Sequence, residues 1–173
     1  MSTRTLRRAA ATGVLALLAS AATLTPANAD EVHFRDKGAH LTTVKVSHSE
    51  DLVAVKARVG NMDIGDYFTF WLDTDSDNAG PEFKTEVYPD SDGISVLKVD
   101  NFSDQGRRVR CDGFRATAEA DGGRYVTIKV PRSCIGEPDR VRVSIRAYYD
   151  VAGPNVVDWG PGKRAFFGWV WRG

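Results

Sequence analysis

A run of acidic side chains at alternate positions is the part of this sequence that most resembles a site. Asp73, Asp75 and Asp77 follow directly after an aromatic segment, and Glu82 lies five residues further on. Carboxylates spaced in this way can place their oxygens around one hard cation such as Ca²⁺. The run begins like an EF-hand loop but departs from it, because Lys84 stands where that loop has its bidentate glutamate. We predict an irregular calcium loop on a β-scaffold, with a solvated acidic turn that hydrogen-bonds to its own backbone as the alternative.

Tryptophan and tyrosine side chains form the second group that could bind a ligand. Trp71, Tyr88 and Trp159 are the candidate ligand-binding residues, because a flat ring beside polar groups can stack on the C–H face of a sugar. The alternative is that these rings fill the core or cover a sheet. Exposed, coplanar rings of Trp71 and Trp159 along a groove would favour glycan binding, whereas their burial would argue against it.

Sequence motifs for catalysis are missing. The chain has no G-x-S-x-G elbow, no H-E-x-x-H pair and no glycine-rich phosphate loop. His33, His40 and His48 would bind zinc only if they converged with a carboxylate, and ordinary surface histidines are the alternative. A binding protein is therefore favoured over an enzyme.

The first 29 residues have the pattern of a secretory signal peptide. Three arginines, Arg4, Arg7 and Arg8, precede an apolar stretch over residues 9–24, and a small-residue A-x-A cleavage site ends at Ala29. We therefore predict a secreted, extracellular protein whose mature part, residues 30–173, is a single domain of 144 residues. No second apolar run of membrane-spanning length follows, so no membrane partner is expected after cleavage.

The net charge changes when the signal peptide is removed. The whole chain has 23 basic and 23 acidic residues, and the segment 1–29 contains three arginines and no acid, which leaves 20 basic against 23 acidic residues and a net charge of −3. This balance excludes a typical nucleic-acid binder, which carries a basic excess. Arg140, Arg142 and Arg146 nevertheless fall on one face of a predicted strand, where they either pair with acids or bind an anionic polymer.

Both cysteines, Cys111 and Cys134, belong to the mature part of the chain. An even number of cysteines in an exported protein predicts a disulfide. Closing a loop of about 24 residues would stabilise the fold by about 3 kcal/mol in the chain-entropy model. Two separate buried thiols are the alternative.

The hydrophobic pattern has the period of strands. Apolar residues alternate with polar ones over residues 53–59, 125–130 and 141–147, while residues 67–72 are bulky on both faces and predict a central strand. We expect nine or ten strands, the last at residues 166–171, at most one short helical turn at 131–136 and one long loop at 150–164. The fold class is all-β, an antiparallel β-sandwich of jelly-roll-like form, with a closed barrel as the alternative.

Three segments carry a resemblance to known proteins. Residues 67–75 (YFTFWLDTD), 80–83 (GPEF) and 131–136 (PRSCIG) resemble uncharacterised secreted proteins of high-GC Gram-positive bacteria. The order of strand, Asp loop and strand is also similar to family 9 carbohydrate-binding and DOMON-like β-sandwiches. This second resemblance implies a sandwich with a structural calcium and a cleft for a sugar or cofactor, and it assigns no role to an individual residue.

These observations predict a secreted, non-catalytic binding module for an extracellular glycan such as a polysaccharide, with calcium as the one cofactor. A protein-interaction or inhibitor-like protein is the alternative, and its contact with a secreted partner protein would be the segment 150–164. A small hydrolase is the third possibility, and it has the least support from the sequence.

Overall fold

The computed structural model describes residues 30–38, 40–89, 91, 94–118, 124–151 and 154–173, so the predicted signal peptide lies outside the described residues. Within them the chain forms twelve strands and one 3-10 turn. These are β1 (Asp30–Arg35), β2 (Thr43–His48), β3 (Leu52–Arg58), β4 (Tyr67–Asp73), β5 (Phe83–Val87), β6 (Leu97–Lys98), β7 (Arg107–Arg108), β8 (Arg115–Ala118), β9 (Tyr125–Pro131), η1 (Arg132–Cys134), β10 (Arg140–Tyr149), β11 (Val156–Gly160) and β12 (Val170–Trp171).

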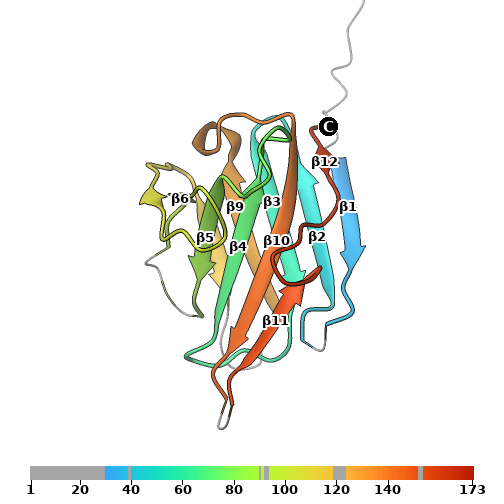
Figure 1. Cartoon of the computed structure of the whole chain (residues 1–173), viewed down its shortest axis with the longest axis vertical. Helices are drawn as coiled ribbons and strands as arrows, with labels where there is room; N and C mark the ends of the chain where they lie inside the picture. Colours follow the sequence, from blue (N-terminus) through green and yellow to red (C-terminus); the bar gives the residue numbers. More distant parts are fainter. Residues whose placement is uncertain (1–29, 39, 90, 92–93, 119–123, 152–153) are drawn as a thin grey trace, which may run out of the picture.

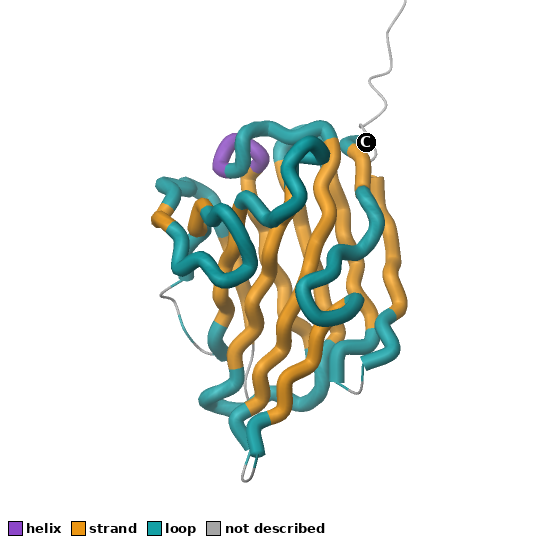
Figure 2. Tube along the Cα trace, in the orientation of Figure 1, coloured by secondary structure: helices purple, strands orange, loops and turns teal. Residues whose placement is uncertain are grey.

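The strands form two antiparallel sheets. Sheet 1 has the order β1-β2-β3-β9-β8, and sheet 2 has the order β11-β10-β4-β5-β6-β7, with β12 also paired to β10. In Figure 1 sheet 2 faces the viewer and sheet 1 lies behind it, and Figure 2 shows that strands and loops make up nearly all of the described chain. The predicted all-β sandwich is therefore confirmed, and its single helical turn, η1, lies within the range predicted for it.

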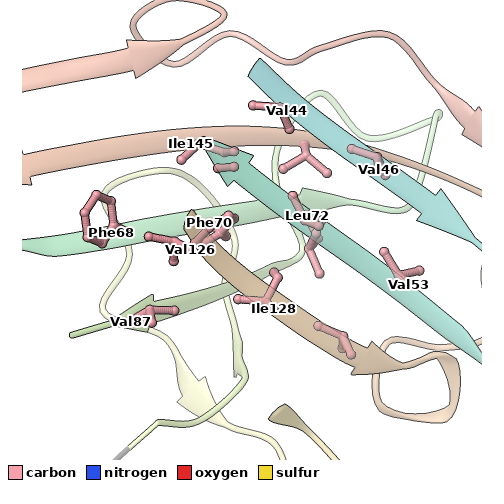
Figure 3. Close-up of a cluster of buried hydrophobic side chains, with 14 of the residues drawn as sticks. Val44, Val46, Val53, Phe68, Phe70, Leu72, Val87, Val126, Ile128 and Ile145 are labelled. Carbon is pink, nitrogen blue, oxygen red and sulfur yellow. The ribbon is translucent and has the colours of Figure 1, made fainter. Parts of the chain in front are cut away.

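The core lies between the two sheets and follows from the alternation seen in the sequence. Val55 of β3 and Ile128 of β9 are opposite each other in the register, and both are fully buried. Phe68, Phe70 and Leu72 of β4 point into the same core from sheet 2 (Figure 3). Burying each such side chain stabilises the fold by about 2 kcal/mol, which explains why the apolar face of each strand turns inward.

Strand β4 is buried on both faces, as its bulky sequence predicts. Six of its seven residues are buried, and it lies between β5 and β10 in the middle of sheet 2. One face packs on the core, and the other carries Thr69, Trp71 and Asp73, which are also buried. The described strands form no third sheet over this outer face. Loops cover it instead, and they create the candidate site described below.

One edge of β10 is paired by a strand that is interrupted in the middle. Strand β11 pairs with residues 145–149 of β10, and β12 pairs with Arg140 and Val141. Between them the Phe167 N–H donates a hydrogen bond to the carbonyl of Val143, so the chain returns to the same edge of the sheet. Residues 161–166 bulge out of this interrupted strand, and the dark red segment of Figure 1 crosses in front of β10.

The predicted loop 150–164 and the predicted strand 166–171 are both corrected by this arrangement. The loop contains strand β11, and only Val170 and Trp171 of the predicted final strand pair in a regular ladder. Glycine and proline suggested a loop, but Gly160 ends a strand at a crowded point, where a Cβ atom would lie 2.4 Å from Cδ2 of Leu41. The glycine is therefore required by close packing, not by a turn.

The predicted disulfide joins Cys111 to Cys134. It ties the segment between β7 and β8 to the turn η1, which directly follows β9. Arg132 in that turn is buried, and its guanidinium donates hydrogen bonds to the carbonyls of Glu50, Glu137 and Pro138. The bridge and this arginine together hold the upper end of the sandwich of Figure 1 in place.

Candidate functional site

The outer face of sheet 2 brings together most of the side chains that the sequence singled out. The register places Trp159 of β11 opposite Arg146 of β10, and Arg146 opposite Thr69 of β4. Trp71 lies on the same face of β4, and Ser144 is its partner on β10. Cations, hydroxyls and indole rings therefore share one surface because strands present every second residue to the same side.

Trp71 and Trp159 are stacked on each other instead of lying side by side. Their ring centroids are 5.2 Å apart and their planes differ by 11°. Phe102, from the loop after β6, packs against both rings with centroid distances of 5.3 and 6.3 Å. Trp71 is consequently only 2% exposed and cannot offer its own face to a ligand, whereas Trp159 is partly exposed. The coplanar pair of exposed rings that would favour glycan binding is not formed, and Trp71 instead supports Trp159.

Tyr88 lies away from the two tryptophans, at the lower end of the same face. It is 43% exposed, and its ring stacks on Tyr67 at 5.6 Å, which in turn stacks on Tyr148 at 4.6 Å. The Tyr88 hydroxyl donates a hydrogen bond to the carboxylate of Glu86, and burial raises the pKa of this tyrosine. This row of tyrosines is a second stacking surface on sheet 2, and Tyr88 is its accessible member.

Arg146 lies at the centre of the face among aromatic rings. Its guanidinium carbon is 5.3 to 5.8 Å from the ring centroids of Tyr67, Trp71 and Trp159. One Nη donates a hydrogen bond to the hydroxyl of Thr69, while the buried Nε has no hydrogen-bond partner in the described part of the chain. No carboxylate of the described residues lies within ion-pair distance of Arg146, in contrast to Arg142. Its charge is therefore available to an anion or to a hydrogen-bond acceptor.

Two loops meet above Arg146 and leave a hollow on each side. Arg164, from the bulge 161–166, donates a hydrogen bond to the Ser103 hydroxyl of the other loop, and Phe166 packs on Phe102. The Trp159 hollow has a volume of about 510 Å³. It is lined by Phe102, Arg146, Val157, Trp159, Lys163 and Arg164.

The Lys84 hollow, on the other side of the two loops, has a volume of about 230 Å³. It shares Phe102, Arg146 and Arg164 with the Trp159 hollow. The remaining lining residues are Trp71, Lys84, Glu86, Ser103, Asp104 and Gln105. The two openings therefore share two guanidinium groups, those of Arg146 and Arg164.

The acidic loop uses its carboxylates for internal contacts. Asp73 is fully buried, accepts a hydrogen bond from Nε of Arg142 at 2.7 Å, and forms an ion pair with Nη2 of the same guanidinium at 2.6 Å. Glu82 accepts hydrogen bonds from the Thr74 backbone N–H and from the side chain of Asn78. Such contacts are those of a turn that caps its own backbone. Among the described residues no group of three acidic, histidine or cysteine side chains is placed to hold a metal ion.

The electrostatics of this loop nevertheless favour a positive charge nearby. Burial is the main cause that raises the pKa of Asp73 and of Glu82, and a neighbouring carboxylate adds to each, Asp75 for the first and Asp73 for the second. The Oδ1 atom of Asp73 is buried without a hydrogen-bond partner in the described structure. Asp75 and Asp77 are exposed, and Asp75 caps the N–H of Asp77. Calcium binding here stays a prediction.

Three residues of the candidate site carried no signal in the sequence. Phe102, Lys163 and Arg164 come from irregular loops, where no periodicity indicates which way a side chain points. Arg146 was placed correctly on a strand face by the alternation of residues 141–147, but its lack of a carboxylate partner depends on three-dimensional neighbours. The three histidines do not converge on this site: His48 is buried on β2 and contacts β12, His33 is exposed on β1, and His40 packs on the ring of Tyr149.

Comparisons with protein-family models, with curated protein sequences and with solved structures found no match to this chain. Among the described residues, none of the helical segments has the length and apolar character needed to cross a membrane. The function must therefore be argued from the geometry of the site.

Proposed function

We propose that this protein is a secreted, non-catalytic binding module whose ligand is an extracellular glycan, held in the Trp159 hollow. The observation that carries the proposal is the position of Arg146, which lines both hollows, lies beside the ring of Trp159 and has no carboxylate partner among the described residues. An aromatic ring next to free N–H donors suits a sugar, which offers a C–H face and hydroxyl or carboxylate oxygens together.

The lowered pKa of Asp104, one of two carboxylates near Arg146, favours binding over hydrolysis. Glu86 and Asp104 are the acidic residues that line the Lys84 hollow. Asp104 accepts hydrogen bonds from the backbone N–H groups of Gly106 and Asp100, which lower its pKa. A glycosidase needs a carboxylic acid whose pKa is raised, so Asp104 is unsuited to protonate a leaving group.

A polysaccharide panel tests the proposal with matched variants. We expect the wild-type protein to bind at least one cell-wall or plant polymer, and Trp159→Ala to weaken that binding by about tenfold, equivalent to about 1.4 kcal/mol of aromatic contact. Arg146→Gln should weaken it as well. Trp171→Ala is the control, because Trp171 is 54% exposed and lines neither hollow. Equal losses in Trp159→Ala and Trp171→Ala, or no binding to any polymer, would reject the proposal.

A contact with a secreted partner protein is the second candidate function. The paired ends of β10 and β11 extend beyond the other strands at the lower end of the molecule (Figure 1). Val151 and Val157 on this hairpin are 44% and 50% exposed, which is unusual for apolar side chains in one small region. If a purified partner is identified, Val157→Lys should abolish its binding while Trp159→Ala leaves it intact.

A further inference from the structure

The outer face of sheet 1, on the opposite side of the sandwich from Trp159, is strongly basic. Its outward positions carry six cations, namely Arg35, Lys45, Lys56, Arg58, Arg115 and Lys129. Glu31 on β1 is the single carboxylate that the described strands present on this face, and it pairs with Lys45 at 2.7 Å. This concentration of charge contrasts with the net charge of −3 predicted for the mature chain.

The cations are placed in ways that cost stability. The register puts Lys45 directly opposite Lys56, and Lys129 directly opposite Arg115. Like charges that face each other across neighbouring strands, with Cβ atoms about 5 Å apart, destabilise a sheet. Carboxylates could have been interleaved here at no cost to the core, because these positions are on the solvent side. The arrangement is therefore better explained by a partner that supplies the missing negative charge.

A hollow lies among the most crowded of these cations. The Lys56 hollow has a volume of about 540 Å³, and the cations that line it are Lys56, Arg115 and Lys129. The hydroxyls of Thr117 and Thr127 lie between them, on directly opposed residues of β8 and β9. Lys129 forms no ion pair with any described residue, and Lys56 lies over the ring of Tyr125 at 4.2 Å. Cations without a carboxylate partner among the described residues, beside hydroxyls, match a ligand that carries both acidic groups and hydroxyls.

We propose that this face of sheet 1 binds an acidic polysaccharide, a sugar polymer with carboxylate, sulfate or phosphate groups, whose chain lies across the strands through the Lys56 hollow. A polymer is favoured over a membrane because Tyr125 is the one large exposed apolar side chain on the described part of this face. A peripheral membrane protein would place several apolar side chains into the lipid interface. The surface shares no lining residue with the Trp159 hollow, so the two proposals can be tested independently.

The test uses immobilised polygalacturonate and heparin as probes, with dextran as the neutral polymer. We expect the wild-type protein to bind both acidic polymers and not dextran, and its affinity to fall as NaCl is raised. The triple variant Lys56→Gln, Arg115→Gln and Lys129→Gln should weaken binding at least about tenfold at low salt. The single variant Lys129→Gln should weaken it in the same direction, and since Lys129 is exposed on β9 we expect this change to leave the fold intact.

The control is a second triple variant with the same change in net charge. Arg107→Gln, Arg108→Gln and Arg110→Gln remove three exposed cations near β7, on the other sheet, and should change the affinity less than about threefold. Equal losses in both triple variants would mean attraction by net charge alone and would overturn the proposal. So would binding to vesicles that contain phosphatidylglycerol without binding to either polymer. If Trp159→Ala abolished polymer binding and the sheet 1 triple variant retained it, the inference would fail while the proposed function stood.

Discussion

Arg142 and Asp73 form an ion pair in which the carboxylate is completely removed from solvent. The Nε and Nη2 atoms of Arg142 both contact Oδ2 of Asp73, while the arginine side chain is 29% exposed. The guanidinium also lies over the rings of Phe166 and Trp169, at 4.8 and 4.6 Å. This arginine therefore joins the acidic loop, the central strand β4 and the segment that returns to β12. Its removal should destabilise all three of these segments.

Arg142→Gln should destabilise the fold by about 2–4 kcal/mol, because it leaves a buried carboxylate without its cation. The expected loss is smaller than for a fully buried pair, since the arginine is partly exposed to solvent. Arg140→Gln is the matched control. Arg140 lies two residues away on the same face, over Trp169 and Trp171, and should cost about 1 kcal/mol or less. Urea denaturation measures both, and a smaller effect for Arg142→Gln than for Arg140→Gln would contradict the expectation.

The pH dependence of the Arg142→Gln variant has a definite sign. Burial already raises the pKa of Asp73 above its ordinary value of 3.8, and loss of the guanidinium should raise it further. A carboxyl whose pKa is raised by folding favours the folded state at low pH and disfavours it as the pH rises through the folded pKa. The variant should therefore lose more stability at pH 7 than at pH 4. Equal losses at both pH values would show that the lost interaction is packing.

Glu82→Ala should destabilise the acidic loop by about 1–3 kcal/mol. The variant removes the acceptor of the Thr74 N–H, which lies 2.7 Å away, and of the Asn78 side chain. Ser76→Ala is the control, because Ser76 is exposed in the same loop and is not a predicted calcium ligand. Melting temperatures measured in CaCl₂ and in EDTA test the calcium prediction in the same proteins. A bound ion would raise the melting temperature of the wild type in CaCl₂ and not that of Glu82→Ala, whereas equal temperatures in both buffers would exclude it.

The predicted secretion can be tested by intact mass. Protein collected from the medium of an expressing bacterium should begin at Asp30 and have Cys111 and Cys134 oxidised, since a signal peptidase recognises the small residues Ala27 and Ala29 and cleaves after Ala29. Ala29→Arg should prevent this cleavage and leave the precursor in the cells. A secreted protein that keeps residues 1–29, or one that is released equally well from the variant, would contradict the prediction.

Most of the fold could be predicted because strands with one buried face leave a clear pattern. The alternation at Val53, Val55 and Ala57 and the bulky faces of β4 both indicated the correct element. The interrupted edge strand could not be predicted. Gly160 and its neighbouring proline indicate a loop in any sequence, whereas the pairing of β11 depends on the long edge that β10 offers. The local sequence does not contain that information.

The candidate site was predictable only in part, for a similar reason. The strand face of Trp71 could be inferred, whereas Trp159 was expected in a loop. The stacking of the two rings could not be inferred, because β10 lies between β4 and β11. Phe102, from a loop distant in the sequence, packs on Trp71, so Trp71 is buried and cannot stack on a ligand. Contacts between residues far apart in the chain decide which aromatic ring remains open to a ligand.

His48 should make the protein sensitive to mild acid. Its ring is fully buried, its Nδ1–H donates a hydrogen bond to the carbonyl of Val170, and its Nε2 has no partner among the described residues. Burial lowers its pKa below the ordinary 6.5, and the nearby Arg132 and Arg172 lower it further, against the opposite effects of the hydrogen bond to Val170 and of Asp139. The unfolded chain therefore binds a proton more readily than the folded one.

The stability that neutral His48 provides should be present above pH 6.5 and lost as the pH falls toward the folded pKa, by up to about 1.4 kcal/mol per pH unit. His48→Gln removes this titration and keeps an N–H donor for Val170. The free energy of unfolding, measured by urea titration between pH 7.5 and 5, should fall less steeply for the variant than for the wild type. Buried carboxyls such as Asp73 titrate in both proteins, so the difference between the two curves isolates His48. Parallel curves would mean that the protonation of His48 is not coupled to folding.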